Sequence, residues 1–324
     1  MKWIIVIDFD IKRDLRGENK LSNNVNTRVE ADFLDNFHLI VDAKEKQNRL
    51  KFFCPIIDAN SLSYDRLIIS LRDAAGHYCL SRRTWDEYVR RPMQLSHLVR
   101  EKFRKLSSND GELGELLLFS FLETDLKAPK LLTKMELKTN PNLYFNGADG
   151  VHYLKLENGD YQLIFGESKV YSNLSKGISA ALNSISDFKT DNIKDDESGS
   201  VRGITFEKGL LNACIAQETY SEEERAFLKS LIYPNTSCQY NVDTAFAVFV
   251  LYDLKIDKKE KMRSNSDFRE WLFTNIKGEI TKMIPSILEK IEDHGLLGHT
   301  FYFYLVPFEQ MDENQKEVLT KVVE

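Results

Sequence analysis

Hydrophobic and polar positions follow two patterns along the chain, and together these patterns predict an α/β protein. Short runs rich in β-branched and aromatic residues predict strands at residues 3–7, 37–41, 50–57, 130–138, 244–251 and 300–306. Longer segments with apolar residues at three- and four-residue spacing predict helices at residues 95–106, 111–123, 172–189, 206–217, 221–232, 267–293 and 312–322. Residues 66–71 fit either state.

The stretch 146–171 predicts two strands joined by a tight turn, with apolar residues on both faces. Its turn residues 158–160 suit a three-residue loop, a type I turn followed by a glycine bulge. That loop would place Asp149 opposite Lys169 and on the same face of the sheet as Glu167. Because both faces are substantially apolar, we expect a central hairpin that is covered on both sides.

Asp149, Glu167 and Lys169 would then meet at one end of a covered sheet. Two carboxylates this close repel each other, and a bound Mg²⁺ would remove the conflict, because this hard cation accepts one or two carboxylates together with water and phosphate oxygens. Mn²⁺ is an expected substitute. The metal would acidify a bound water, while the lysine would orient that water or stabilise the transition state. This is the chemistry of phosphodiester hydrolysis.

A purely structural interpretation is also open, in which Asp149 and Lys169 form a cross-strand ion pair. The spacing of the three residues alone would favour it. A further carboxylate comes from the predicted helix at residues 111–123, where Glu112 and Glu115 lie in the first turns and suit the helix dipole. Glu115 is the better candidate for an additional metal ligand, because its side of the helix carries the apolar residues that must face the sheet.

The chain has 324 residues, enough for one large or two ordinary domains. The loop-forming and N-capping residues 107–111 mark a preferred boundary. We therefore predict an N-terminal mixed α/β module at residues 1–108, a candidate partner interface, and a second domain at residues 109–324. Arginines interleaved with aromatic residues at 82–91 could follow a phosphate backbone, although a solvated or protein-facing helix is the commoner meaning of such a pattern.

Composition narrows the function classes. The hydrophobic share of 42% and the charged share of 29% are ordinary for a globular protein. No apolar run approaches the roughly 18 residues of a membrane span, so we expect no membrane partner and a cytoplasmic location. The four cysteines are scattered, which predicts buried free thiols in a reducing compartment. A net charge of −6 is unusual for a protein that holds DNA unaided and suggests that a partner delivers it.

The predicted order from residue 111 to residue 251 is helix, strand, hairpin, helix and strand. With Asp149, Glu167 and Lys169 in the hairpin, this order resembles the PD-(D/E)xK core of restriction-endonuclease-like proteins, a mixed sheet between helices. Ala148 replaces the proline of the motif's name, and that proline carries no chemistry.

The resemblance extends to a particular family. The segments GELGELLLFSFLE, LKAPKLLTKMELKTNPN, NGADGVH and GESKVY resemble the HamA family, effector subunits of the bacterial Hachiman anti-phage system. The similarity is close over about residues 111–188 and looser elsewhere. It implies a Mg²⁺-dependent DNase controlled by a superfamily 2 helicase, HamB, with Asp149, Glu167 and Lys169 as catalytic positions and Glu115 as a further one.

Two alternatives belong to other classes. A nuclease-fold subunit could bind and regulate a helicase without cleaving DNA, although such degenerate members usually lose one of the three hairpin residues. An enzyme of other chemistry is disfavoured, because the sequence contains no dinucleotide-binding GxGxxG, P-loop, GxSxG or zinc-ligand spacing. His152 lies beside Asp149 but on the opposite face in the predicted register, so we expect a packed strand histidine.

Overall fold

The computed structural model describes residues 26–103, 111–137, 147–191, 193–194, 201–236 and 238–324, together with residues 4–6. For residues 4–6, 193–194 and 201–202 it describes the backbone alone. The predicted domain boundary between residues 108 and 109 lies outside the described residues.

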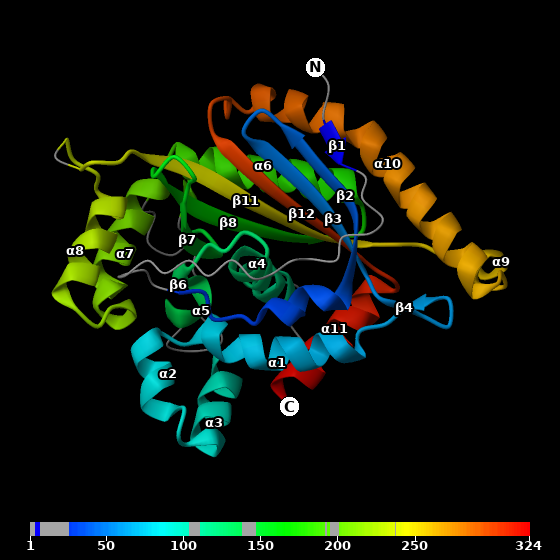
Figure 1. Ribbon diagram of the computed structural model, residues 1–324, viewed down its shortest axis with the longest axis horizontal. Helices are drawn as coiled ribbons and strands as arrows, with labels where there is room; N and C mark the ends of the chain where they lie inside the picture. The colour runs from blue at the N-terminus through cyan, green and yellow to red at the C-terminus, as the bar shows by residue number, and fades with distance from the viewer. Residues whose placement is uncertain are drawn as a thin grey trace.

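A mixed sheet of eight strands forms the centre of the molecule (Figure 1). In spatial order its strands are β1 (Ile4–Val6), β2 (Phe37–Glu45), β3 (Asn48–Pro55), β12 (Thr300–Phe308), β11 (Val242–Asp253), β8 (Tyr161–Tyr171), β7 (Gly150–Lys155) and β6 (Lys130–Thr133). The four central strands β3, β12, β11 and β8 are parallel, and the pairs toward either edge are antiparallel. This architecture confirms the predicted α/β class with a mixed sheet.

Helices cover both faces of the sheet. One face carries α6 (Leu174–Lys189), α7 (Ile204–Glu218), α8 (Glu222–Ile232) and α10 (Asn265–Asp293). The other carries η1 (Ala31–Asn36), α1 (Asp65–Cys79), α4 (Glu112–Thr124) and α11 (Met311–Val323). Strand β11 shows the alternation that this requires, since Val248 and Val250 belong to the first hydrophobic cluster and Ala247 and Phe249 to the second.

The remaining elements are short. They are β4 (Ile57–Asp58), β5 (Ser61–Leu62), α2 (Arg82–Tyr88), α3 (Pro92–Lys102), α5 (Lys134–Leu137), β9 (Ile193–Lys194), β10 (Val201–Arg202) and α9 (Lys258–Lys261). Residues 66–71, which fitted either state, belong to α1. The strand predicted at 130–138 stops at Thr133, because the Thr133 hydroxyl accepts from the Glu136 N–H at 3.4 Å and starts α5.

The strands before residue 103 belong to the same sheet as the predicted nuclease core. β3 pairs in parallel with β12, with Arg49 opposite Tyr302. Both hydrophobic clusters also contain residues from the two predicted parts, for example Phe52 with Val248 in one and Leu71 with Phe249 in the other. The two parts therefore share one sheet and one pair of cores.

The hairpin β7–β8 differs from its predicted register by two positions. Gly150 lies opposite Gly166 and Lys155 opposite Tyr161, so the same register continued by one residue sets Asp149 opposite Glu167 and not opposite Lys169. Because the register is displaced by an even number of residues, Asp149, Glu167 and Lys169 still lie on the same face of the sheet.

The turn explains the displacement. The loop does have three residues, but they are 157–159, one position earlier than predicted, and the Leu156 N–H donates to the Asp160 carbonyl at 2.8 Å to close it. Gly159 has a φ of +90° and occupies the last loop position, where the glycine bulge needs a left-handed residue.

Candidate functional site

The predicted hairpin residues meet at the open end of β7 and β8, on the face covered by α6 and α7. Asp149 lies just before β7 and is 7% exposed. One of its carboxylate oxygens accepts from the Ser168 N–H at 2.7 Å, and the other lies 3.3 Å from the Lys134 Nζ. The carboxylate is therefore held by the neighbouring strand and by a lysine of α5.

Glu167 carries the second carboxylate. Its Oε1 lies 2.6 Å from the Lys169 Nζ. The pKa of Glu167 is raised to about 7, chiefly by burial and also by the charge of Asp149, while Lys169 and Lys134 oppose the rise. Because the β7–β8 register, continued by one residue, sets Asp149 opposite Glu167, the two carboxylates lie close enough to repel each other.

The structure therefore brings Asp149, Glu167 and Lys169 together, and it adds Lys134. The cross-strand ion pair considered between Asp149 and Lys169 is replaced by two pairs, Lys134 with Asp149 and Lys169 with Glu167. Lys134 was missed because its segment was predicted to continue as a strand.

Glu115 lies on α4, the helix that packs on the opposite face of the sheet. Gly114 beside it would contact Ser168 and Val170 if it carried a Cβ. The Glu115 Oε2 accepts from the Tyr78 hydroxyl at 2.6 Å. A group of three or more His, Cys, Asp or Glu side chains arranged to hold a metal is not found in the described ranges. The role of Glu115 as a ligand stays a prediction.

Glu207, on the first turn of α7, was not singled out from the sequence. It is 4% exposed. Burial raises its pKa to about 7, the nearby charge of Asp149 raises it too, and Lys134 and a hydrogen bond from the Ala148 N–H oppose the rise. A glutamate in a first turn is ordinary, so nothing local in the sequence marks it.

The donor set suits a hard divalent cation. Mg²⁺ is usually bound through one or two carboxylates plus water and phosphate oxygens, and Asp149 and Glu167 are such a pair. A cation between them would also relieve the repulsion that helps to raise the pKa of Glu167.

The other residues considered are structural. His152 is 1% exposed, and its Nδ1 lies 2.8 Å from the Ala128 carbonyl on the side of the sheet away from Asp149, as expected. In the basic stretch, the Arg82 N–H donates to the Glu218 Oε1 at 3.0 Å and the Arg83 guanidinium donates to the Thr219 carbonyl. These two arginines tie α2 to the end of α7.

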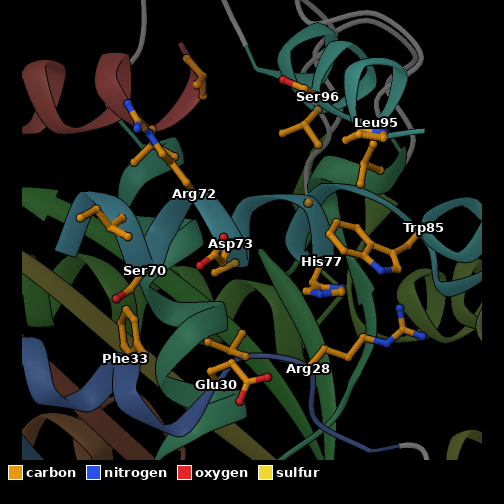
Figure 2. A pocket seen from close by; sticks show the side chains of 18 of the residues that line it. Arg28, Glu30, Phe33, Ser70, Arg72, Asp73, His77, Trp85, Leu95 and Ser96 are labelled. Carbon is orange, nitrogen blue, oxygen red and sulfur yellow. The ribbon is translucent and has the colours of Figure 1, made fainter. Parts of the chain in front are cut away.

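A groove of about 860 Å³ lies apart from these residues, between η1, α1, α2, α3 and the end of α11. Figure 2 shows the Trp85 and His77 rings together on one side of it, with Arg72 and Asp73 from α1 and Leu95 from α3 around it. Ile69, which also lines the groove, is 61% exposed. The groove thus combines aromatic, apolar and charged side chains, a composition found in protein interfaces.

The covered mixed sheet, with carboxylates and lysines at the end of its hairpin, defines an α/β protein with a nuclease-like fold. A family model described as HamA matches residues 31–322. The chain therefore belongs to the HamA family and is a component of the Hachiman defence system. A comparison with curated proteins finds none that matches. Across the described ranges, no helix is both long and apolar enough to cross a membrane.

Proposed function

We propose that the chain is a metal-dependent deoxyribonuclease that hydrolyses DNA phosphodiesters in the bacterial cytoplasm. The observation that supports this most is the opposed pair Asp149 and Glu167, two largely buried carboxylates at the end of a covered hairpin with Lys169 beside them. Burying two such charges side by side is unfavourable unless cations offset them. Lys134 and Lys169 offset part of the charge, and a bound metal ion would offset more.

In this proposal Asp149 and Glu167 hold Mg²⁺, for which Mn²⁺ substitutes. When bound, the ion would neutralise phosphate charge and acidify water. Lys169, 2.6 Å from the Glu167 Oε1, would then orient the attacking water or donate to the phosphate, where negative charge grows in the transition state. The Ser168 N–H keeps the Asp149 carboxylate directed at the site.

The test is DNA degradation by the purified chain with Mg²⁺, alone and with the helicase subunit. Glu167→Ala and Lys169→Ala should each lower cleavage by about a hundredfold or more while leaving the fold intact. Glu157→Ala and Lys155→Ala remove the same charges from exposed positions of the same hairpin and should cleave normally.

If both site variants cleave like the wild type, the hairpin is not the catalytic site. If the wild type and every variant are silent with and without the helicase, the non-cleaving regulatory subunit becomes the better description.

We further propose that a superfamily 2 helicase, HamB, is the partner that delivers DNA and controls cleavage. The net charge of −6 supports a partner, because phosphate binding normally requires a basic surface. The groove of α1, α2 and α3 supports the N-terminal part as the docking surface, because it lies apart from Asp149 and Glu167 and exposes Ile69.

A further inference from the structure

We propose that Glu207 is a positioning residue, which fixes the backbone that leads into Asp149 and so sets how tightly the site binds Mg²⁺. The inference rests on the proposed function of Asp149 as a metal ligand. Glu207 would act through the peptide before Asp149 and would not itself touch the ion.

The contact that carries the inference joins α7 to the segment before β7. The Glu207 carboxylate lies against the backbone of Gly147, and the neighbouring Ala148 N–H opposes the rise in its pKa. A Cβ built on Gly147 would lie 2.5 Å from the Glu207 Oε2, so the carboxylate approaches the backbone of both residues. Gly147 has a φ of +151°, a conformation that residues with side chains rarely adopt. Glycine at 147 therefore allows both the bend and the close approach.

The other backbone groups around Asp149 are also held. The Asp149 N–H donates to the Gly166 carbonyl at 2.9 Å, and its carbonyl accepts from the Lys134 N–H at 3.1 Å. The first bond fixes Asp149 to β8 and the second to α5. The contact of Glu207 with the backbone at Gly147 adds a link on the side that precedes the ligand.

Glu207 lies on a helix, α7, and the position of its carboxylate is therefore well fixed. Leu211 and Ile215 anchor α7 in the hydrophobic cluster under the sheet. At its far end Glu218 accepts from the Arg82 N–H at 3.0 Å. A carboxylate carried by a helix fixed at both ends holds its target more closely than one on a loop. Partners of this kind, which orient a ligand without touching the metal, typically account for a ten- to hundredfold change in metal affinity.

The experiment compares Glu207→Ala and Glu207→Gln in the full chain. Glutamine keeps a carbonyl oxygen that can accept from the Ala148 N–H but loses the charge. Metal binding is read without DNA, as the rise of Tm with Mg²⁺ and as Mn²⁺ bound in an electron paramagnetic resonance titration. Glu223→Gln removes the same charge from an exposed position of α8 and serves as the control.

We expect Glu207→Ala to weaken Mg²⁺ and Mn²⁺ binding about ten- to hundredfold, with Glu207→Gln and Glu223→Gln close to the wild type. Cleavage by Glu207→Ala should recover at high Mg²⁺. Equal losses in the alanine and glutamine variants would overturn the inference in favour of a direct, charge-dependent role. Wild-type metal affinity in Glu207→Ala would overturn it outright. A wild type that binds no metal and cleaves no DNA would instead refute the proposed function.

Discussion

At the scale of single residues, His152 shows how a polar side chain three positions from Asp149 can belong to the core. Its ring packs 5.9 Å from that of Phe119, and its Nδ1 donates to the Ala128 carbonyl. Its Nε2 is buried and has no hydrogen-bond partner within the described structure. Burial lowers the pKa of His152 to about 4, the Ala128 bond opposes this and the charge of Lys130 adds to it.

The lowered pKa predicts that the protein loses stability in mild acid. The folded state keeps His152 neutral down to about pH 4, whereas the unfolded chain takes up a proton near the ordinary value of 6.5. The stabilisation is therefore complete above pH 6.5 and falls as the pH drops toward 4. His152→Asn should reduce the loss of unfolding free energy between pH 7 and pH 5 by about 2 kcal/mol, measured by urea unfolding.

Burial also lowers the pKa of His77, to about 3, so part of the pH dependence should survive in His152→Asn. An unchanged slope in His152→Asn would show that this histidine does not contribute.

Asp149, Glu167 and Lys169 could be grouped from the sequence because side chains alternate between the two faces of a strand. The error of two residues in the register left them on the same face. Sequence reasoning missed Lys134 and Glu207 because each reaches the site through the tertiary fold. Lys134 does so from a helical turn that a threonine starts, and Glu207 from a helix some distance along the chain.

At the scale of elements, the long periodic segments were predictable and their ends were less so. Strands β11 and β12 and helices α6, α8 and α10 are found close to their predicted ranges. Their apolar positions alone are enough to set the type of element. The hairpin loop was predicted at 158–160 and lies at 157–159. Both loops contain Gly159, and only its left-handed φ shows that it takes the last loop position.

Helix α6 packs closely on the sheet through Gly177, which predicts a difference between two glycines. A Cβ on Gly177 would lie 2.6 Å from the Val250 Cγ1, whereas a Cβ on Gly278 of α10 would meet nothing within 4 Å. Gly177→Ala should lower the free energy of unfolding by about 1 kcal/mol, because the crowding against Val250 costs more than the gain in helix propensity. Gly278→Ala, with the same gain and no crowding, should stabilise by about 0.5–1 kcal/mol. Urea unfolding of both variants checks this, and a similar gain in both would mean that α6 is not tightly packed.

At the scale of the whole molecule, the site and the groove occupy separate regions linked by α7. At the beginning of α7, Glu207 contacts the backbone of Gly147, two residues before Asp149; at its end, Glu218 accepts from the Arg82 N–H of α2, next to the groove. A partner bound to α2 and α3 would therefore contact elements that pack on α7, the helix beside the proposed metal ligand Asp149. This arrangement gives the proposed helicase a physical route to the site.

Docking in the groove predicts a selective loss of the helicase complex. Ile69→Glu would place a charge among the apolar side chains of the groove, and we expect co-purification of the chain with HamB to fall at least tenfold. Leu297→Glu makes the same change at an equally exposed position, 62% against 61%, between α10 and β12, and should leave the complex intact. If the Ile69 variant still co-purifies at the wild-type level, the helicase docks elsewhere.

Because β3 pairs in parallel with β12, the sheet can be completed only after β12 has been translated. The ribosome makes β3 long before β12, so the two halves of the sheet stay unjoined until residues 300–308 have been translated. Pairings between distant segments also form slowly, because a long loop must close first. A translation product interrupted before residue 300 lacks β12 and cannot complete the sheet behind Asp149 and Glu167. For a proposed DNase, this topology would protect the cell's own chromosome from unfinished copies of the enzyme.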